Sequence, residues 1–360
     1  MKKLSLSILL CLLVLSVSLA KTKPAVLITG GAGYIGSHTA YLMTQKGYKV
    51  IILDSLEHGQ TFDHTWATCI NSDFADEKVL KKIFETHNIE AVIHFAGFIE
   101  VGESVKNPMK FYENNVLKTI KLLKSMIAHN VKKFIFSSSC AVYGNPQWLP
   151  LTEDHPKNPI SPYGKNKLMV EMALQDFANA YDLHYVALRY FNAAGAMPEQ
   201  GLGENHNPET HLIPIIFRAV IEKRPFYIFG TDYDTKDGSC IRDFIHVWDL
   251  AQAHWLALEY LNKGNTSDCF NLGTGNGFSV KEVCKTVEKI CKHKLNILHK
   301  DRRPGDPPML IADPKKAKDK LGWQAQYSDL ENILKTAYEF TIQYRPSFIN
   351  PLKFDAFLSL

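Results

Sequence analysis

Residues Val26 to Gly36 read V-L-I-T-G-G-A-G-Y-I-G, and this stretch decides the fold. It begins with a short apolar run, after which glycines fall at Gly30, Gly33 and Gly36 and a helix-compatible pattern follows. The pattern predicts a buried strand, a tight turn and the start of a helix. The first glycine permits a sharp turn, the second lets the backbone approach a pyrophosphate, and the third allows close packing of helix on strand. Because helix N-termini bind phosphate groups, the stretch predicts a dinucleotide site.

An acidic residue ends the second apolar run. The run from Val50 to Leu53 is followed by Asp54, eighteen residues past Gly36. A carboxylate at that distance suits the two ribose hydroxyls of NAD and would repel the 2′-phosphate of NADP. NAD is therefore the predicted cofactor.

Composition excludes several classes of function. The length of 360 residues fits one large α/β domain or two domains, and the net charge of +4 comes without any block of Lys and Arg. We therefore expect no binding of nucleic acid. The seven cysteines form no C-x-x-C pair and no zinc-like spacing with histidine, so no metal site is predicted. Cys284 and Cys291 could share a helix face and are interpreted as buried free thiols.

Residues 1–20 do not fit an ordinary cytosolic enzyme. Lys2 and Lys3 precede an apolar run from Leu4 to Leu19, and Ser18-Leu19-Ala20 resembles a signal-peptidase site. Three interpretations remain open: a secretory signal, an uncleaved membrane anchor, or a start codon assigned upstream of the true one. Membrane contact is expected only if the leader is uncleaved, and localisation stays uncertain because the predicted chemistry is cytosolic.

Strand and helix patterns alternate beyond Asp54. They comprise strands at Thr68 to Asn71, Ala91 to Phe95 and Phe134 to Phe136, and helices at Glu77 to Thr86 and Asn115 to Ala128. This alternation predicts a doubly wound parallel Rossmann sheet with ligands at the carboxyl ends of its strands. We expect an NAD-binding domain at residues 21–190 that returns near 240–262, a smaller mixed α/β C-terminal substrate domain at 191–346 and a tail at 347–360.

A second informative stretch is S-P-Y-G-K-N-K, from Ser161 to Lys167. Proline suits a first helical turn, so Tyr163 and Lys167, four residues apart, lie on one helix face. A phenol has a pKa of about 10, and bringing it to about 7 requires roughly 4 kcal/mol of preferential phenolate stabilisation. The lysine ammonium and the positive nicotinamide ring are both candidates for that stabilisation. With Ser139 at the end of an upstream strand, the pair predicts a catalytic site.

Further motifs follow in order along the chain. They are H-F-A-G (His94 to Gly97), V-G-E-S (Val101 to Ser104), S-S-S-C-A-V-Y-G (Ser137 to Gly144), R-Y-F-N (Arg189 to Asn192), R-D-F-I-H-V (Arg242 to Val247), N-L-G-T-G (Asn271 to Gly275) and R-R-P-G-D (Arg302 to Asp306). Together with the two stretches above, they resemble the UDP-glucose 4-epimerase family of extended short-chain dehydrogenases/reductases. The resemblance covers about residues 25 to 340.

The resemblance implies roles for individual residues. Tyr163 would take the proton from the sugar 4-hydroxyl while hydride passes from C4 to NAD, Lys167 would hold the ribose hydroxyls and depress the tyrosine pKa, and Ser139 would bind O4. The positions expected around NAD include the glycine turn and the end of the H-F-A-G strand. They are Gly30, Gly33, Tyr34, Ile35, Gly36, Asp54, Asp73, Phe74, Phe95, Ala96, Gly97, Asn114, Tyr163, Lys167 and Phe191. Positions around the UDP-sugar are Ser139, Tyr163, Asn192, His211, Leu212, Tyr227, Phe229, Arg242, Arg303, Asp306 and Leu310. A homodimer is usual in the resembled family.

Two departures from the family pattern bear on cofactor and substrate. Ile99 stands where a lysine near the NAD phosphates is common, which puts one phosphate contact in doubt. Leu310 stands four residues after Asp306, where some members carry a tyrosine that crowds the sugar 2-position. Our hypothesis is that the smaller side chain also admits UDP-N-acetylglucosamine and UDP-N-acetylgalactosamine.

Three alternatives to a 4-epimerase stay open. A nucleotide-sugar dehydratase of the same superfamily would need a carboxylate just after Ser139, where the chain has Cys140 and Ala141. An enzyme acting on UDP-uronic acids would need an extra basic residue that is not evident in the sugar loops. A non-catalytic NAD-binding regulator would dispense with Tyr163, Lys167 or Ser139, all of which are present.

Overall fold

The computed structural model describes residues 24–57, 65–206, 208–303 and 306–344. The leader at residues 1–20 and the tail at 347–360 lie outside the described residues, so the expectations about them stay predictions. Within the described ranges, no helix combines the length and the apolar character needed to cross a membrane.

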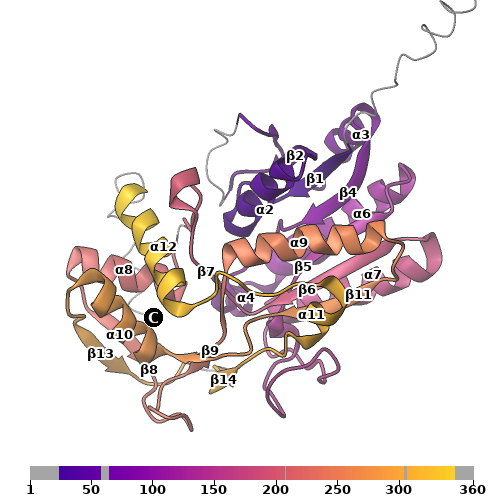
Figure 1. Ribbon diagram of the computed structural model, residues 1–360. Coiled ribbons are helices and arrows are strands. Elements are labelled where there is room, and N and C mark those ends of the chain that lie inside the picture. Colours follow the sequence, from indigo (N-terminus) through magenta and orange to yellow (C-terminus); the bar gives the residue numbers. More distant parts are fainter. Residues whose placement is uncertain (1–23, 58–64, 207, 304–305, 345–360) are drawn as a thin grey trace, which may run out of the picture.

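A seven-stranded parallel sheet forms the centre of the molecule (Figure 1), in the strand order β11-β6-β5-β4-β1-β2-β3. Its strands are β1 (Ala25–Thr29), β2 (Lys49–Asp54), β3 (Thr68–Asn71), β4 (Ile89–His94), β5 (Lys133–Ser139), β6 (His184–Tyr190) and β11 (Asp268–Leu272). The order runs outward from β1 in both directions, which confirms the predicted doubly wound fold. In such sheets the ligand crevice lies where the order reverses, here between β1 and β4.

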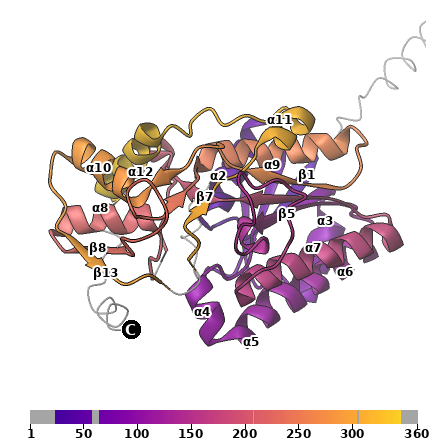
Figure 2. The same cartoon turned by 90° about the horizontal axis from the view of Figure 1, so that it is seen from below.

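Helices cover both faces of this sheet, as Figure 2 shows. Alternate residues of a strand point to opposite faces, so Val26 and Ile28 join one apolar core and Ala25 and Leu27 join the other. The first core is closed by α2 (Tyr34–Gln45), α9 (Val247–Asn262) and α11 (Lys315–Leu321), and the second by α3 (Glu77–Thr86), α6 (Lys118–Ala128) and α7 (Pro162–Tyr181). Burial of both faces explains why the strands read as unbroken apolar runs.

The segment between β4 and β5 differs from the continuous helix expected from Asn115. Helix α6 begins only at Lys118 and follows α4 (Val101–Lys106), α5 (Pro108–Phe111) and a π-helical turn, η1 (Tyr112–Leu117). The Asn115 side chain accepts a hydrogen bond from the Phe98 amide at 2.8 Å and donates one to the Phe98 carbonyl at 2.9 Å. These bonds tie the wider turn to the loop after β4, a local feature that the apolar periodicity does not report.

The remaining elements form a smaller mixed α/β unit beside the sheet (Figure 1). Helices α8 (Leu212–Glu222), α10 (Val280–Cys291) and α12 (Leu330–Tyr344) share a separate apolar core with the parallel pair β8 (Phe226–Phe229) and β13 (Ile297–Lys300). Cys284 and Cys291 are buried free thiols in α10, as predicted. Short strands link the unit to the sheet, namely β7 (Asn192–Ala194) with β10 (Phe244–His246), and β12 (Phe278–Ser279) with β9 (Ile241–Arg242) and β14 (Met309–Leu310).

The chain returns to the central sheet for longer than the expected residues 240–262. Beyond α9, strand β11 pairs with β6, and α11 contributes Ala317 to the core under the sheet. The Trp323 indole nitrogen then donates to the Asp249 carbonyl at 2.8 Å, which fixes the end of this return on α9. The two expected domains are therefore interleaved more deeply in the chain than the composition suggested.

Candidate active site

The glycine turn closes around the carboxyl ends of β1 and β4. Gly30 has φ +72°, and a Cβ there would lie 2.4 Å from the Ala96 nitrogen. A Cβ on Gly36 would lie 2.2 Å from the Gly30 carbonyl oxygen, so neither position has room for a side chain. Helix α2 begins after Gly33, which has no side chain to cap the first backbone N–H groups. These groups are thus available to phosphate oxygens, and the turn fits a dinucleotide.

Asp54 lies at the end of β2, beside this turn. Its Oδ2 accepts a hydrogen bond from the Ala32 amide at 3.0 Å, and its Oδ1 accepts one from the Leu56 amide at 2.9 Å. The two amides hold the carboxylate next to the glycine turn, which is the position from which ribose hydroxyls are recognised.

The H-F-A-G stretch follows β4 directly. The Thr29 carbonyl accepts from both the Phe95 and the Ala96 amides, at 2.9 and 3.1 Å, so the ends of β1 and β4 stay side by side. A Cβ on Gly97 would lie 3.2 Å from Asn115 Oδ1. Ala96 and Gly97 therefore sit where the strand order reverses, as the predicted cofactor role requires.

A charged network joins the predicted cofactor residues after β3 and in η1. Lys118 Nζ lies 2.5 Å from Asp73 Oδ2 and 3.1 Å from Asn114 Oδ1, and the Phe74 ring packs on His94 with centroids 5.1 Å apart. Sequence reasoning missed Lys118. Its spacing of four residues from Asn114 was the available signal.

The side chains of Ser139, Tyr163 and Lys167 are brought together at one edge of the sheet. Ser139 ends β5 and lies near enough to Tyr163, in the first turn of α7, to lower the pKa of that tyrosine. Ser161 caps that helix by accepting from the Gly164 amide at 3.1 Å. Lys167 Nζ lies 5.7 Å from the centre of the Tyr163 ring and donates to the Ser137 carbonyl at 2.7 Å.

Burial sets the protonation of this trio. It raises the pKa of Tyr163 to about 12, with the Ser139 hydrogen bond acting in the opposite direction. It lowers the pKa of Lys167 to about 8, and the nearby Glu171 carboxylate opposes that shift. Bringing the tyrosine from about 12 to about 7 costs on the order of 7 kcal/mol, more than an exposed phenol would need. A positive charge near the ring would favour the phenolate at neutral pH.

A buried ion pair fixes α7 against the sheet. Arg189 on β6 contacts Glu171 at 2.6 Å, and the Ser138 hydroxyl donates to the same carboxylate at 2.5 Å. Both members of the pair are nearly inaccessible, at 2% and 8% side-chain exposure. Glu171 was not singled out in the sequence, although it lies one turn after Lys167. The pair holds the helix that carries Tyr163 and Lys167.

Residues expected around the sugar nucleotide come from separate elements. Asn192 begins β7 and donates to the Asp243 carbonyl at 3.1 Å. His211 precedes the first residue of α8, Leu212. Arg303 stacks on Phe229 of β8 at 4.0 Å, two residues beyond Tyr227 in the same strand.

A second group of these residues gathers near β9. Arg242 of β9 forms an ion pair with Asp306, and Leu310 is its register partner in β14. Leu310 packs on a small apolar cluster that contains Phe191 and Cys140, the residue after Ser139. Leu310 is thereby brought to the same apolar cluster as a predicted cofactor residue.

Among the remaining predicted cofactor residues, Tyr34 and Ile35 begin α2 and Phe95 follows β4. The Tyr34 hydroxyl donates to the Gly195 carbonyl at 2.6 Å, and Ile35 packs against the core that α2 covers. The Phe95 ring lies 4.5 Å from the His254 ring of α9. A doubly wound sheet with this glycine turn, and a tyrosine and lysine facing a strand-end serine, is characteristic of the short-chain dehydrogenase/reductase class.

Comparisons with known proteins narrow that class. The model of the NAD dependent epimerase/dehydratase family matches residues 26–273. UDP-glucose 4-epimerase of Halalkalibacterium halodurans is 49% identical over 317 residues, 88% of this chain and 95% of that protein. The crystal structure of UDP-glucose 4-epimerase from Brucella ovis in complex with NAD is 46% identical, with a TM-score of 0.85 over 88% of this chain and 97% of that one. The UDP-Glc/GlcNAc 4-epimerase of Campylobacter jejuni is 42% identical, with a TM-score of 0.78 over 89% and 99%.

The chain belongs to the NAD dependent epimerase/dehydratase family.

The high pKa of Tyr163 gives a spectroscopic prediction. Without cofactor, the difference in phenolate absorbance between the wild type and Tyr163→Phe should stay near zero up to about pH 10.5, because burial disfavours the charged phenolate. When the protein is saturated with NAD⁺, the phenolate absorbance difference should appear at a lower pH, because the positive nicotinamide ring favours the phenolate. A phenolate difference near pH 8 in cofactor-free protein would contradict the burial argument. Tyr181→Phe, at an exposed tyrosine of the same helix, is the matched control.

Proposed function

We propose that the protein interconverts UDP-glucose and UDP-galactose by epimerisation at C4, using tightly bound NAD. The observation that carries the proposal is the convergence of Ser139, Tyr163 and Lys167 beside a glycine turn fit for a dinucleotide. The relatives named UDP-glucose 4-epimerase, at 46–49% identity over 88% of the chain, support the same activity.

The trio performs the proton chemistry in this proposal. The Tyr163 phenolate accepts the proton of the sugar 4-hydroxyl, while Ser139 donates a hydrogen bond to O4. Lys167 stabilises the phenolate from one helical turn away. NAD, when bound, supplies a reversible hydride acceptor, so that a 4-keto sugar that turns in the site regains hydride on its opposite face. Arg242 and Arg303 are the candidate partners of the diphosphate, because a guanidinium can pair two phosphate oxygens at once.

The alternatives are less well supported by the site. A dehydratase would need an acid and a base next to the reacting sugar, yet Ser139 is followed by Cys140, a partly buried thiol whose pKa is raised to about 12 by desolvation. A non-catalytic NAD-binding regulator gives no reason for Lys167 to be buried beside Tyr163. The 4-epimerase accounts for both residues.

Substitution of the base tests the function directly. The purified full-length chain should convert UDP-galactose to UDP-glucose without added cofactor, as followed by chromatography. Tyr163→Phe should lower turnover by about 10²- to 10⁴-fold while NAD stays bound, because only proton transfer is lost. Tyr181→Phe is the control and should keep wild-type turnover. No turnover by folded wild-type protein, even with added NAD, would overturn the assignment.

We also propose that N-acetylated UDP-sugars are substrates. Leu310 is partly buried and packs on the cluster that contains Phe191 and Cys140, the residue after Ser139. A leucine leaves more room there than a tyrosine would. The Campylobacter jejuni relative, named as a UDP-Glc/GlcNAc 4-epimerase, supports dual specificity in this family.

Enlarging that side chain should separate the two activities. In Leu310→Tyr, turnover of UDP-N-acetylglucosamine should fall by about tenfold or more while turnover of UDP-galactose changes little, because the ring crowds the 2-substituent. Leu298→Tyr, at an exposed position of β13, is the matched control. The proposal fails if the wild type does not turn over UDP-N-acetylglucosamine, or if Leu310→Tyr slows both reactions equally.

A homodimer is proposed on the basis of an exposed apolar surface on neighbouring helices. The helices α4, α5 and η1 all pack beside α7. Their exposed large apolar side chains are Val101, Val105, Met109, Leu117, Met169 and Met172. Exposed apolar side chains gathered on neighbouring helices are typical of protein interfaces, and a second copy of the chain is the expected partner.

One charge in that surface should disrupt the dimer. Met172 is 62% exposed, so Met172→Glu should leave the fold intact but place a charge in the interface. Sedimentation velocity should give a dimer for the wild type and a monomer for this variant. Ile342→Glu, at an exposed residue of α12, should remain dimeric. A monomeric wild type would exclude the dimer.

A further inference from the structure

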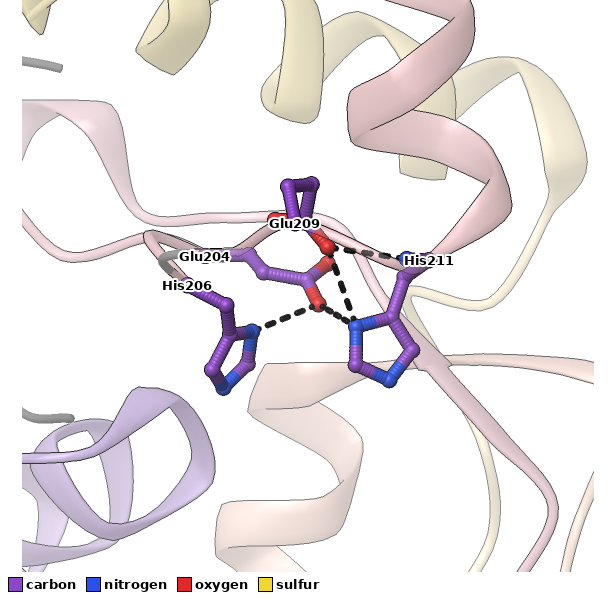
Figure 3. Close-up of side chains that lie close together, drawn as sticks. All are labelled: Glu204, His206, Glu209 and His211. Carbon is purple, nitrogen blue, oxygen red and sulfur yellow. Dashed lines mark hydrogen bonds and ion pairs between the residues drawn. The ribbon is translucent and has the colours of Figure 1, made fainter. Parts of the chain in front are cut away.

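Four potential metal ligands converge in the segment before α8. Glu204, His206, Glu209 and His211 each direct one ligand atom toward the others, and these atoms all lie within 4.8 Å of one another (Figure 3). Glu204 Oε1 is 2.7 Å from His211 Nδ1 and 3.2 Å from His206 Nδ1. Glu209 Oε1 is 3.1 Å from His211 Nδ1. Two imidazoles and two carboxylates thus meet at one point.

The two carboxylates share one imidazole nitrogen as a common partner. Both are almost inaccessible, with side-chain exposures of 8% for Glu204 and 4% for Glu209. They converge on His211 Nδ1, which carries at most one hydrogen. Two buried carboxylates this close repel each other unless a positive charge lies between them. A protonated His211 can supply that charge, and a divalent cation would supply it with both histidines neutral.

The backbone and a neighbouring cavity suit such a cation. Glu209 Oε1 also accepts from the Thr210 and His211 amides, each at 2.8 Å, which fixes the carboxylate in place. The His206 ring lies edge-on to Tyr34, with centroids 6.5 Å apart, so it is held against α2. A cavity of about 50 Å³, lined by Glu204, His206 and Glu209, opens beside the cluster and offers an entry path.

We propose that Glu204, His206, Glu209 and His211 bind one divalent transition-metal ion of the Zn²⁺ class. Imidazole nitrogen and carboxylate oxygen together suit Zn²⁺ and its neighbours better than Mg²⁺ or Ca²⁺, which favour oxygen alone. The ion would cross-link the segment that leads into α8 and fix His211 at the start of that helix. The cluster shares His211 with the residues expected around the sugar nucleotide but contains no member of the Tyr163 trio, and a metal titration reads it out without the proposed epimerase activity.

Metal titration tests the proposal. Tag-free, full-length protein, stripped with a chelator, should bind about one equivalent of Zn²⁺ in calorimetry, and Zn²⁺ should raise its thermal unfolding midpoint. Co²⁺ in place of Zn²⁺ should give visible absorption bands of a low-symmetry nitrogen and oxygen site. His206→Gln and Glu209→Gln should each weaken Zn²⁺ binding by about 100-fold or more, since each removes a ligand. His299→Gln, at an exposed histidine of β13, is the control and should bind as the wild type does.

Two results would overturn the site. One is a wild-type protein that takes up no stoichiometric Zn²⁺ or Co²⁺. The other is Zn²⁺ binding by His206→Gln and Glu209→Gln that matches the control variant, with circular dichroism showing all the proteins folded.

Discussion

The close contact between the glycine turn and the ends of β1 and β4 is the constraint on which the rest of the structure depends. Gly36 approaches the Gly30 carbonyl so closely that no side chain fits, and Gly30 itself abuts the backbone of Ala96. This contact brings the N-terminus of α2 to the point where the strand order reverses. The same strand edge carries Asp54 and, farther along, Ser139, so the predicted cofactor turn and the predicted catalytic hydroxyl belong to one sheet.

The protonation of Tyr163 depends on the groups that surround its ring. Burial makes the tyrosine a weaker acid than free phenol, and Lys167 alone supplies one nearby ammonium. The Arg189–Glu171 pair holds α7 so that this ammonium stays one turn from the ring. An oxidised nicotinamide ring would add a second positive charge and so favour the phenolate in the proposed reaction.

The sequence predicted the doubly wound sheet because buried parallel strands and helices have distinct apolar periods, and helix Glu77–Thr86 was placed with its observed bounds. It did not predict the start of α6, because the hydrogen bonds of Asn115 that hold the π turn are long-range. It also indicated no metal site. Glu204, His206, Glu209 and His211 match no zinc-like spacing, and only the folded segment shows that their ligand atoms meet. The roles of the individual cofactor and sugar residues stay predictions.

The most direct measurement of the central claim follows the hydrogen at C4. The protein would be incubated with UDP-galactose deuterated at C4, in ordinary water, and the UDP-glucose formed would be examined by mass spectrometry and NMR. If hydride is held on bound NAD and returned to the same carbon, the deuterium stays at C4 of the product. Loss of the deuterium to solvent would contradict the account, because it would mean that C4 is epimerised by proton exchange.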